Sequence, residues 1–195
     1  MQGKYSNTDG NEKIIYNDSN SNSISLNIAS SGQQESIRII QDLLYVLIEN
    51  QKSFRIMEEP EAHLYPKAQK NLIELIALII NKTQSQIVIT THSPYVLSIV
   101  NNLLLYSVVL DNKPDTNNTI QEHFGTANLN IEQREKINLM QSQVQAYSLN
   151  RNSEIYCSSI TDSETSLIGD NFLDNITEEL NNDFNTLYHL NFQNS

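Results

Sequence analysis

Two adjacent carboxylates at the end of an apolar run are the residues of this chain best suited to chemistry. The run covers residues 54–57, and Glu58, Glu59 and Pro60 follow it directly. Its length is typical of a buried strand, and a proline prevents the strand from continuing through a central sheet. Because α/β proteins bind ligands at the carboxyl ends of parallel strands, these acids could serve a nucleotide's Mg²⁺ and an attacking water. A solvated acidic strand end explains them equally well.

Two further polar clusters lie at places where a helix is expected to begin or a strand to end. Residues 30–34 read Ser-Ser-Gly-Gln-Gln, and residues 91–94 read Thr-His-Ser-Pro. Ser-Ser-Gly before a helix supplies a cap and exposed N–H groups, which together make a potential anion site. Ordinary helix capping accounts for the same residues and is the preferred interpretation of this motif alone.

The elements that must position these clusters follow the pattern of parallel α/β architecture. Residues 54–58 and 86–90 predict two parallel strands, and Pro66 predicts the start of a buried helix over 66–81 between them. A further helix is expected after residues 30–34, with its apolar face formed by Ile37, Ile40, Leu44, Leu47 and Ile48.

The strand over 86–90 is followed by a second polar strand end. Ser93 and Pro94 predict the start of a short helix, and the apolar run over 103–110 predicts the last strand of the sheet. In this arrangement Glu59 and His92 are expected to project from the same sheet edge, within reach of one phosphate.

The N-terminal segment over 1–28 predicts two or three strands at a sheet edge. Asp9-Gly10 is a strong hairpin signal, and residues 23–28 alternate between polar and apolar, as in a half-buried strand.

The C-terminal part is polar and carries no testable motif. Residues 131–140 could be helical, and residues 144–149 and 154–158 predict a hairpin. A final helix is expected, with its apolar face formed by Leu173, Ile176, Leu180, Phe184, Leu187 and Leu190.

Composition narrows the classes of protein. The 195 residues suffice for one domain with a core, and the formal net charge of -11 argues against a nucleic-acid surface dominated by charge. Direct nucleic-acid binding through a local basic patch stays open. A single cysteine excludes an internal disulfide framework. With no signal pattern and no apolar run of membrane length, a cytoplasmic protein without membrane contact is expected.

Together, the three clusters resemble the ATP-binding-cassette (ABC) class of ATPases, and especially the OLD and RecF-like branch known as AAA family ATPases. Residues 30–35 and 58–66 are similar to strings in ATPase subunits of Septu and retron-associated anti-phage systems. The resemblance covers residues 1–110. It implies the C-terminal lobe of an ABC-type P-loop ATPase, with a partly parallel sheet, flanking helices and a small α+β tail.

Three segments are expected in this α/β fold, the first from the resemblance and the other two from polarity and periodicity. Residues 1–110 would form the ATPase lobe, with signature loop, Walker B strand, D-loop and switch histidine. Residues 111–128 would form a linker or mobile loop, and residues 129–195 a tail with a hairpin and a terminal helix.

The resemblance also assigns roles. Ser31, Gly32 and Gln34 match the signature loop, which in this class reaches the γ-phosphate held by the opposite protomer. Residues 62–65 match the loop that crosses the dimer interface.

The acids and the histidine match the hydrolytic machinery of that class. Glu58 matches the Walker B acid that holds Mg²⁺, where Asp is more common. Glu59 matches the catalytic glutamate that orients the attacking water, and His92 matches the switch histidine that hydrogen-bonds the γ-phosphate.

One departure from the class concerns the phosphate loop. The G-x-x-x-x-G-K-[ST] pattern, called Walker A, occurs nowhere in the chain. The resemblance therefore implies an ATP-binding and ATP-hydrolysing module, part of an anti-phage system, that is active only when a Walker A lobe completes it. The implied partners are ATP, a Walker A-containing chain in a homo- or hetero-oligomer, and a nuclease.

The alternative is a non-enzymatic interaction or regulatory subunit that keeps the fold. A nuclease of the Toprim type ranks lower, because the tail has no strand ending in Asp-x-Asp.

Overall fold

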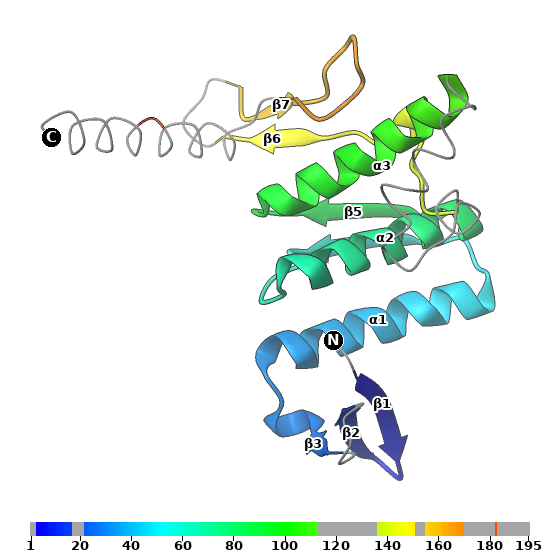
Figure 1. Cartoon of the computed structure of the whole chain (residues 1–195), viewed down its shortest axis with the longest axis vertical. Coiled ribbons are helices and arrows are strands. Elements are labelled where there is room, and N and C mark those ends of the chain that lie inside the picture. The colour runs from blue at the N-terminus through cyan, green and yellow to red at the C-terminus, as the bar shows by residue number, and fades with distance from the viewer. Residues whose placement is uncertain (1–2, 17–21, 113–135, 151–154, 170–181, 183–195) are drawn as a thin grey trace, which may run out of the picture. The chain divides into compact units, whose positions relative to one another are not determined.

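The structure is a computed structural model that describes residues 3–16, 22–112, 136–150, 155–169 and 182. The chain divides into two compact units, which are described separately here (Figure 1). Unit 1 comprises Met1–Thr91 with Glu132–Ile137, and unit 2 comprises His92–Ile131 with Asn138–Ser195.

Unit 1 begins with the predicted antiparallel strands. β1 (Gly3–Thr8) and β2 (Asn11–Tyr16) are joined at Asp9-Gly10, both with positive φ, of 51° and 81°. Two consecutive left-handed residues are the geometry that an Asp-Gly hairpin turn requires, so the hairpin prediction is confirmed. β3 (Ser23–Ser25) pairs with the other side of β2.

The strand predicted over 23–28 is only half right. Leu26–Ile28 forms a short 3-10 helix, η1. Residues three apart lie on opposite faces of a strand but on one side of a 3-10 turn. The turn thus lets Leu26 and Ala29 both enter the buried cluster that also contains Ile14 and Ile37. Core packing therefore overrides the alternating pattern.

Helix α1 (Ser31–Glu49) forms where it was predicted, but its buried face agrees with the predicted one only in part. Ile37, Leu43 and Val46 are buried, whereas Leu44 and Ile48 are 40% and 77% exposed. The helix has apolar residues on more than one side, so periodicity alone could not select the buried face. Helix α1 packs against α2.

The predicted strand–helix–strand unit is confirmed. β4 (Phe54–Glu58) pairs in parallel with β5 (Gln86–Thr90), and α2 (Pro66–Thr83) connects them. Pro66 is the first residue of α2, and the interior of this helix is heavily buried, with Ile79 at 1% exposure. The result is a mixed α/β fold with a small parallel sheet and flanking helices.

A hydroxyl network joins the two strands at their amino ends. The Ser53 N–H donates to the Ser85 hydroxyl at 3.1 Å, and the two hydroxyls lie 3.0 Å apart. The Thr83 hydroxyl lies 2.6 Å from that of Ser85 and donates to the carbonyl of Ile79. These buried hydroxyls are therefore satisfied, as burial requires, and they secure the end of the sheet opposite the carboxylates.

An ion pair links α1 to β4. Arg55 donates from Nε to Asp42 Oδ2 at 2.6 Å and from Nη2 to Asp42 Oδ1 at 3.0 Å. This hydrogen bonding lowers the pKa of Asp42 below its ordinary 3.8. Because the Asp42 side chain is 51% exposed, solvent screening limits the contribution of the pair to less than about 1 kcal/mol.

The lowered pKa predicts a pH dependence of the Asp42→Asn variant. The contribution of Asp42 to stability is present above pH 3.8 and is lost as pH falls below that value through the lowered pKa of the folded state. We expect urea unfolding to show Asp42→Asn less stable than wild type at about pH 7, with the difference shrinking at about pH 3. Glu49→Gln, an exposed change on the same helix, is the control; an unchanged difference at both pH values would contradict this prediction.

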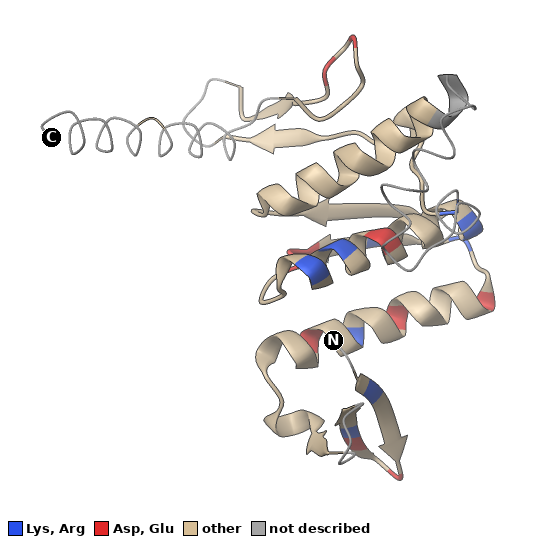
Figure 2. Ribbon diagram, viewed as in Figure 1, with Lys and Arg blue, Asp and Glu red and all other residues tan. Residues whose placement is uncertain are grey.

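Unit 2 contains one long helix where a short helix and a strand were predicted. α3 runs over Pro94–Asn112, so it begins at Pro94 as expected, but the strand predicted over 103–110 is wrong. A continuous apolar run looks the same in a buried helix and a buried strand. Figure 2 shows charged residues on α1 and α2 but none along the coloured length of α3.

The rest of unit 2 confirms the tail hairpin in outline. β6 (Tyr147–Leu149) pairs antiparallel with β7 (Cys157–Ser159), after a 3-10 turn, η3 (Gln141–Gln143). Residues 136–140 are not helical, which contradicts the end of the helix considered over 131–140. The rest of that helix, residues 113–128 of the linker and the predicted C-terminal helix lie outside the described residues. None of the described helices is long and apolar enough to cross a bilayer.

Candidate functional site

The carboxyl ends of β4 and β5 bring the predicted acids to one edge of the parallel sheet. Glu58 is the last residue of β4 and pairs with Thr90, the last residue of β5. The Glu59 N–H donates to the carbonyl of Thr90 at 3.0 Å and lies 3.3 Å from its hydroxyl oxygen. Glu58 is exposed and Glu59 half-buried. Both carboxylates therefore lie where ligands of parallel sheets bind.

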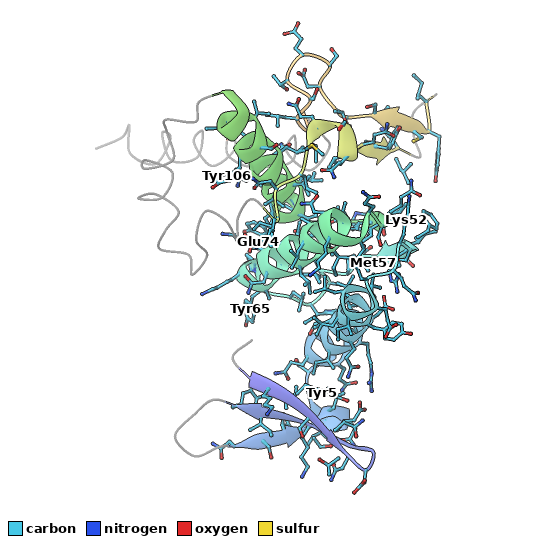
Figure 3. All side chains as sticks on the ribbon, turned by 90° about the vertical axis from the view of Figure 1, so that its right-hand side faces the viewer. Tyr5, Lys52, Met57, Tyr65, Glu74 and Tyr106 are labelled. Atoms are coloured by element: carbon cyan, nitrogen blue, oxygen red, sulfur yellow. The ribbon has the colours of Figure 1, made fainter. Side chains whose placement is uncertain are left out.

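Residues 59–65, called the acidic loop here, connect β4 to α2. Figure 3 labels Met57 of β4, which lies before the loop in the chain, and Tyr65, which precedes α2. It contains two turns, closed by bonds from Ala62 N to the Glu59 carbonyl at 2.9 Å and from Leu64 N to the Glu61 carbonyl at 3.0 Å.

Two residues of the acidic loop have a left-handed backbone. Glu59 has a φ of 41° and His63 a φ of 60°. This conformation is uncommon for residues other than glycine and is found preferentially at functional sites. Asn or Gly would adopt the φ of position 59 more easily, so turn formation alone does not explain Glu59.

Gly32 lies directly against the acidic loop. A Cβ atom at Gly32 would lie 2.6 Å from the His63 carbonyl oxygen and 3.1 Å from the His63 Cβ. Only glycine permits this approach, since a side chain would meet backbone atoms that cannot turn away. The structure thus brings the start of α1 and the acidic loop together. The sequence alone did not predict this contact.

The polar residues at the start of α1 first serve to cap the helix. The Ser30 hydroxyl accepts from the Gln33 N–H at 3.4 Å, and Gln33 Oε1 accepts from the Ser30 N–H at 3.2 Å. This is a capping box, so the preferred interpretation of the motif is confirmed. Gln34 Nε2 donates to the carbonyl of Ala29 at 2.8 Å, which orients that side chain toward the preceding segment.

Two groups at the start of α1 remain available after capping. The N–H groups of Ser31 and Gly32 donate to no protein acceptor among the described residues. Ser31 is exposed, and helix-terminal N–H groups of this kind attract anions. The available donors are therefore backbone groups of Ser31 and Gly32 rather than the Gln34 side chain.

His92 begins unit 2, directly after Thr91, where the first segment of unit 1 ends. It follows the end of β5 by two residues in the chain. The prediction that His92 reaches the same phosphate as Glu59 stays a prediction.

Glu61 is the residue of the site that the sequence did not reveal. It is 4% exposed, and it accepts a hydrogen bond from the Thr91 hydroxyl. Hydrophobic periodicity indicates burial in helices and strands but not in a loop. Nothing in the sequence therefore distinguishes the buried Glu61 from the exposed Glu58. The capping box was detectable, because Ser30 and Gln33 have the spacing that defines it.

Comparison with known proteins bears on the first half of the chain. No curated protein and no solved structure matches. Residues 2–97 match a family model described as AAA ATPase domain, and this range includes α1, the acidic loop and β5. This part of the chain is therefore similar to an AAA-family ATPase, a nucleotide-binding module.

Proposed function

We propose that the chain supplies the water-orienting and magnesium-binding carboxylates of an ATP-hydrolysing module, and that a Walker A segment outside this sequence holds the phosphates. The observation that carries the proposal is the placement of Glu58 and Glu59 at the shared carboxyl edge of β4 and β5. The match to the AAA ATPase domain supports ATP as the substrate.

Glu59 is proposed to orient and polarise the attacking water. Its backbone is fixed by the bond to Thr90 and by the turn to Ala62. With its backbone held in this way, the Glu59 carboxylate can accept a hydrogen bond from water without a further loss of backbone freedom.

Glu58 fits the role of a single protein ligand for a nucleotide-bound Mg²⁺. Among the described residues, no group of three or more His, Cys, Asp or Glu side chains could hold a metal ion. Mg²⁺ at nucleotide sites needs only one or two carboxylates, because phosphates and waters complete its six ligands. When bound, the ion would neutralise charge that develops on the phosphates.

The start of α1 is proposed to act on a nucleotide held by another protomer. The N–H groups of Ser31 and Gly32 are the donors, and Gln34 keeps the preceding segment in place through Ala29. His92 is proposed to hydrogen-bond the γ-phosphate. A working form would then be at least dimeric.

An exposed apolar face supports the need for another segment. Phe54, Ile56 and Val88 of the parallel pair are 64%, 69% and 45% exposed. Parallel sheets are normally covered on both faces, so a two-stranded sheet with this surface is typical of part of a larger sheet. The same face favours the second candidate, an interaction or regulatory subunit without catalysis.

The resemblance to Septu and retron-associated ATPase subunits extends the proposal to anti-phage defence, with a nuclease as a further partner. The finer assignment to the OLD and RecF-like branch belongs to this proposal as well. It rests on residues 30–35 and 58–66.

Phosphate release and light scattering test the proposal. We expect the purified chain to release no significant phosphate from Mg·ATP, because its sequence has no Walker A pattern to hold the β- and γ-phosphates in place for Glu59. Adding the product of a neighbouring gene with a Walker A motif should restore turnover and give an oligomer with ATP. A species that stays monomeric and inactive with every such product would favour the regulatory subunit.

A further inference from the structure

Glu61 is a buried carboxylate to which the proposed function gives no role. Its Oε1 atom accepts from the Thr91 hydroxyl, whereas Oε2 is buried without a hydrogen-bond partner among the described residues. Burying a carboxylate oxygen without a donor is unfavourable, and an apolar residue of similar volume would fill the position at less cost. Packing alone therefore does not explain why a glutamate occupies this buried position.

The bond between Glu61 and Thr91 links the acidic loop to the residue that follows β5. A second bond joins the Glu59 N–H to the Thr90 carbonyl at 3.0 Å. Thr90 and Thr91 are adjacent in the chain, and Glu59 and Glu61 lie in one turn, which the bond from the Ala62 N–H to the Glu59 carbonyl closes at 2.9 Å. A displacement of the β5 end would therefore act on both links.

We propose that Glu61 is a positioning residue that fastens Thr91 to the turn carrying Glu59. Thr91 ends the first segment of unit 1 and directly precedes His92, so the bond to Glu61 holds the residue from which the chain continues to the histidine. The importance of Glu59 and His92 rests on the proposed function, whereas the coupling through Glu61 and Thr91 can be measured without nucleotide.

Substitutions at both ends of the link separate positioning from space filling. Thr91→Val removes the hydroxyl but keeps the shape, and Thr91→Ser keeps the hydroxyl. Glu61→Gln keeps an acceptor oxygen, and Glu61→Leu removes it. Thr91→Ala serves as a second hydroxyl deletion in case valine crowds the site.

Hydrogen exchange measured by NMR on the full chain is the readout. We expect Thr91→Val and Glu61→Leu each to speed exchange of the Glu59 amide about tenfold, the effect of losing one hydrogen bond, while the buried Ala77 amide in α2 is unchanged. The double variant should show no further increase. Thr91→Ser and Glu61→Gln should stay within about twofold of wild type, since the link is kept.

The His92 ring signals provide a second readout that simple loss of stability would not change. They should broaden or split in Thr91→Val and return to the wild-type pattern in Thr91→Ser. Uniformly faster exchange throughout unit 1, additive effects in the double variant, or failure of serine to rescue would overturn the positioning role.

Adding Mg·ATP with a Walker A-bearing partner separates this inference from the proposed function. If nucleotide leaves the Glu59 and His92 signals of wild type unchanged, the proposed function fails, and the exchange results still decide the role of Glu61. If nucleotide shifts those signals but Thr91→Val leaves the Glu59 amide protected, only the positioning role fails.

Discussion

If Glu59 orients the attacking water as proposed, we expect Glu59→Gln to lower kcat of the assembled ATPase by about 10²- to 10⁴-fold, the range typical of a lost general base. Glutamine has the shape of glutamate, so the turn to Ala62 and the bond to Thr90 are retained. An amide cannot take a proton from the attacking water, whereas the groups that bind the nucleotide are unaffected. We therefore expect the Kd for Mg·ATP to stay within about twofold, so that the loss appears in kcat alone.

Single-turnover phosphate release and a fluorescent-nucleotide titration measure these two quantities. The matched control is Glu49→Gln, which removes the same charge from the exposed end of α1. An equal loss of kcat in the control, or full activity of Glu59→Gln, would contradict the assignment of Glu59. Robust hydrolysis by the purified chain alone that Glu59→Gln leaves intact would overturn the view that the phosphates are held elsewhere.

Changing Gly32 to alanine destabilises unit 1, although alanine is the better helix former. The added Cβ would lie 2.6 Å from the His63 carbonyl oxygen and 3.2 Å from its carbon. Helix propensity favours alanine by about 1 kcal/mol at most, while overpacking against backbone costs about 1–3 kcal/mol. The close contact decides the sign, and we expect a lower free energy of unfolding and a melting temperature lower by several degrees.

The neighbouring Ser31→Ala variant is the control for Gly32→Ala. Ser31 is exposed, so its free energy of unfolding should stay within about 0.5 kcal/mol of wild type. Adding His63→Gly should recover part of the loss in Gly32→Ala, because glycine accepts the φ of 60° at position 63 and lets the loop move. A Gly32→Ala chain as stable as wild type would show that the loop yields easily.

The close contact with His63 thus requires glycine at position 32, independently of any role in phosphate binding. If Gly32→Ala also lowers activity, the loss has two possible origins: displacement of the acidic loop, or obstruction of the Gly32 N–H group by the added methyl group. Ser31→Ala does not have this ambiguity, since it keeps the backbone N–H and the contact to His63. Comparing the two variants shows whether the start of α1 acts through its backbone or through the Ser31 hydroxyl.

The sequence by itself determined the elements whose signals are local. Asp9-Gly10 specifies its hairpin because few residues accept two consecutive positive φ angles. Pro66 and Pro94 mark helix starts, since proline has no N–H to donate. The β-branched run over 86–90 and the run over 54–58, each followed by polar residues, sufficed to place Glu58 and Glu59 at one edge.

Only the tertiary structure decided features that depend on residues distant in the chain. The run over 103–110 has the composition of a strand or a buried helix, and it continues α3. Leu26 leaves the strand pattern because the core cluster around Ile14 accepts it from a 3-10 turn. The burial of Glu61 depends on Thr91, and the need for glycine at position 32 depends on His63; no local pattern records either contact. Periodicity describes one element at a time, whereas close approach and burial are properties of pairs of elements.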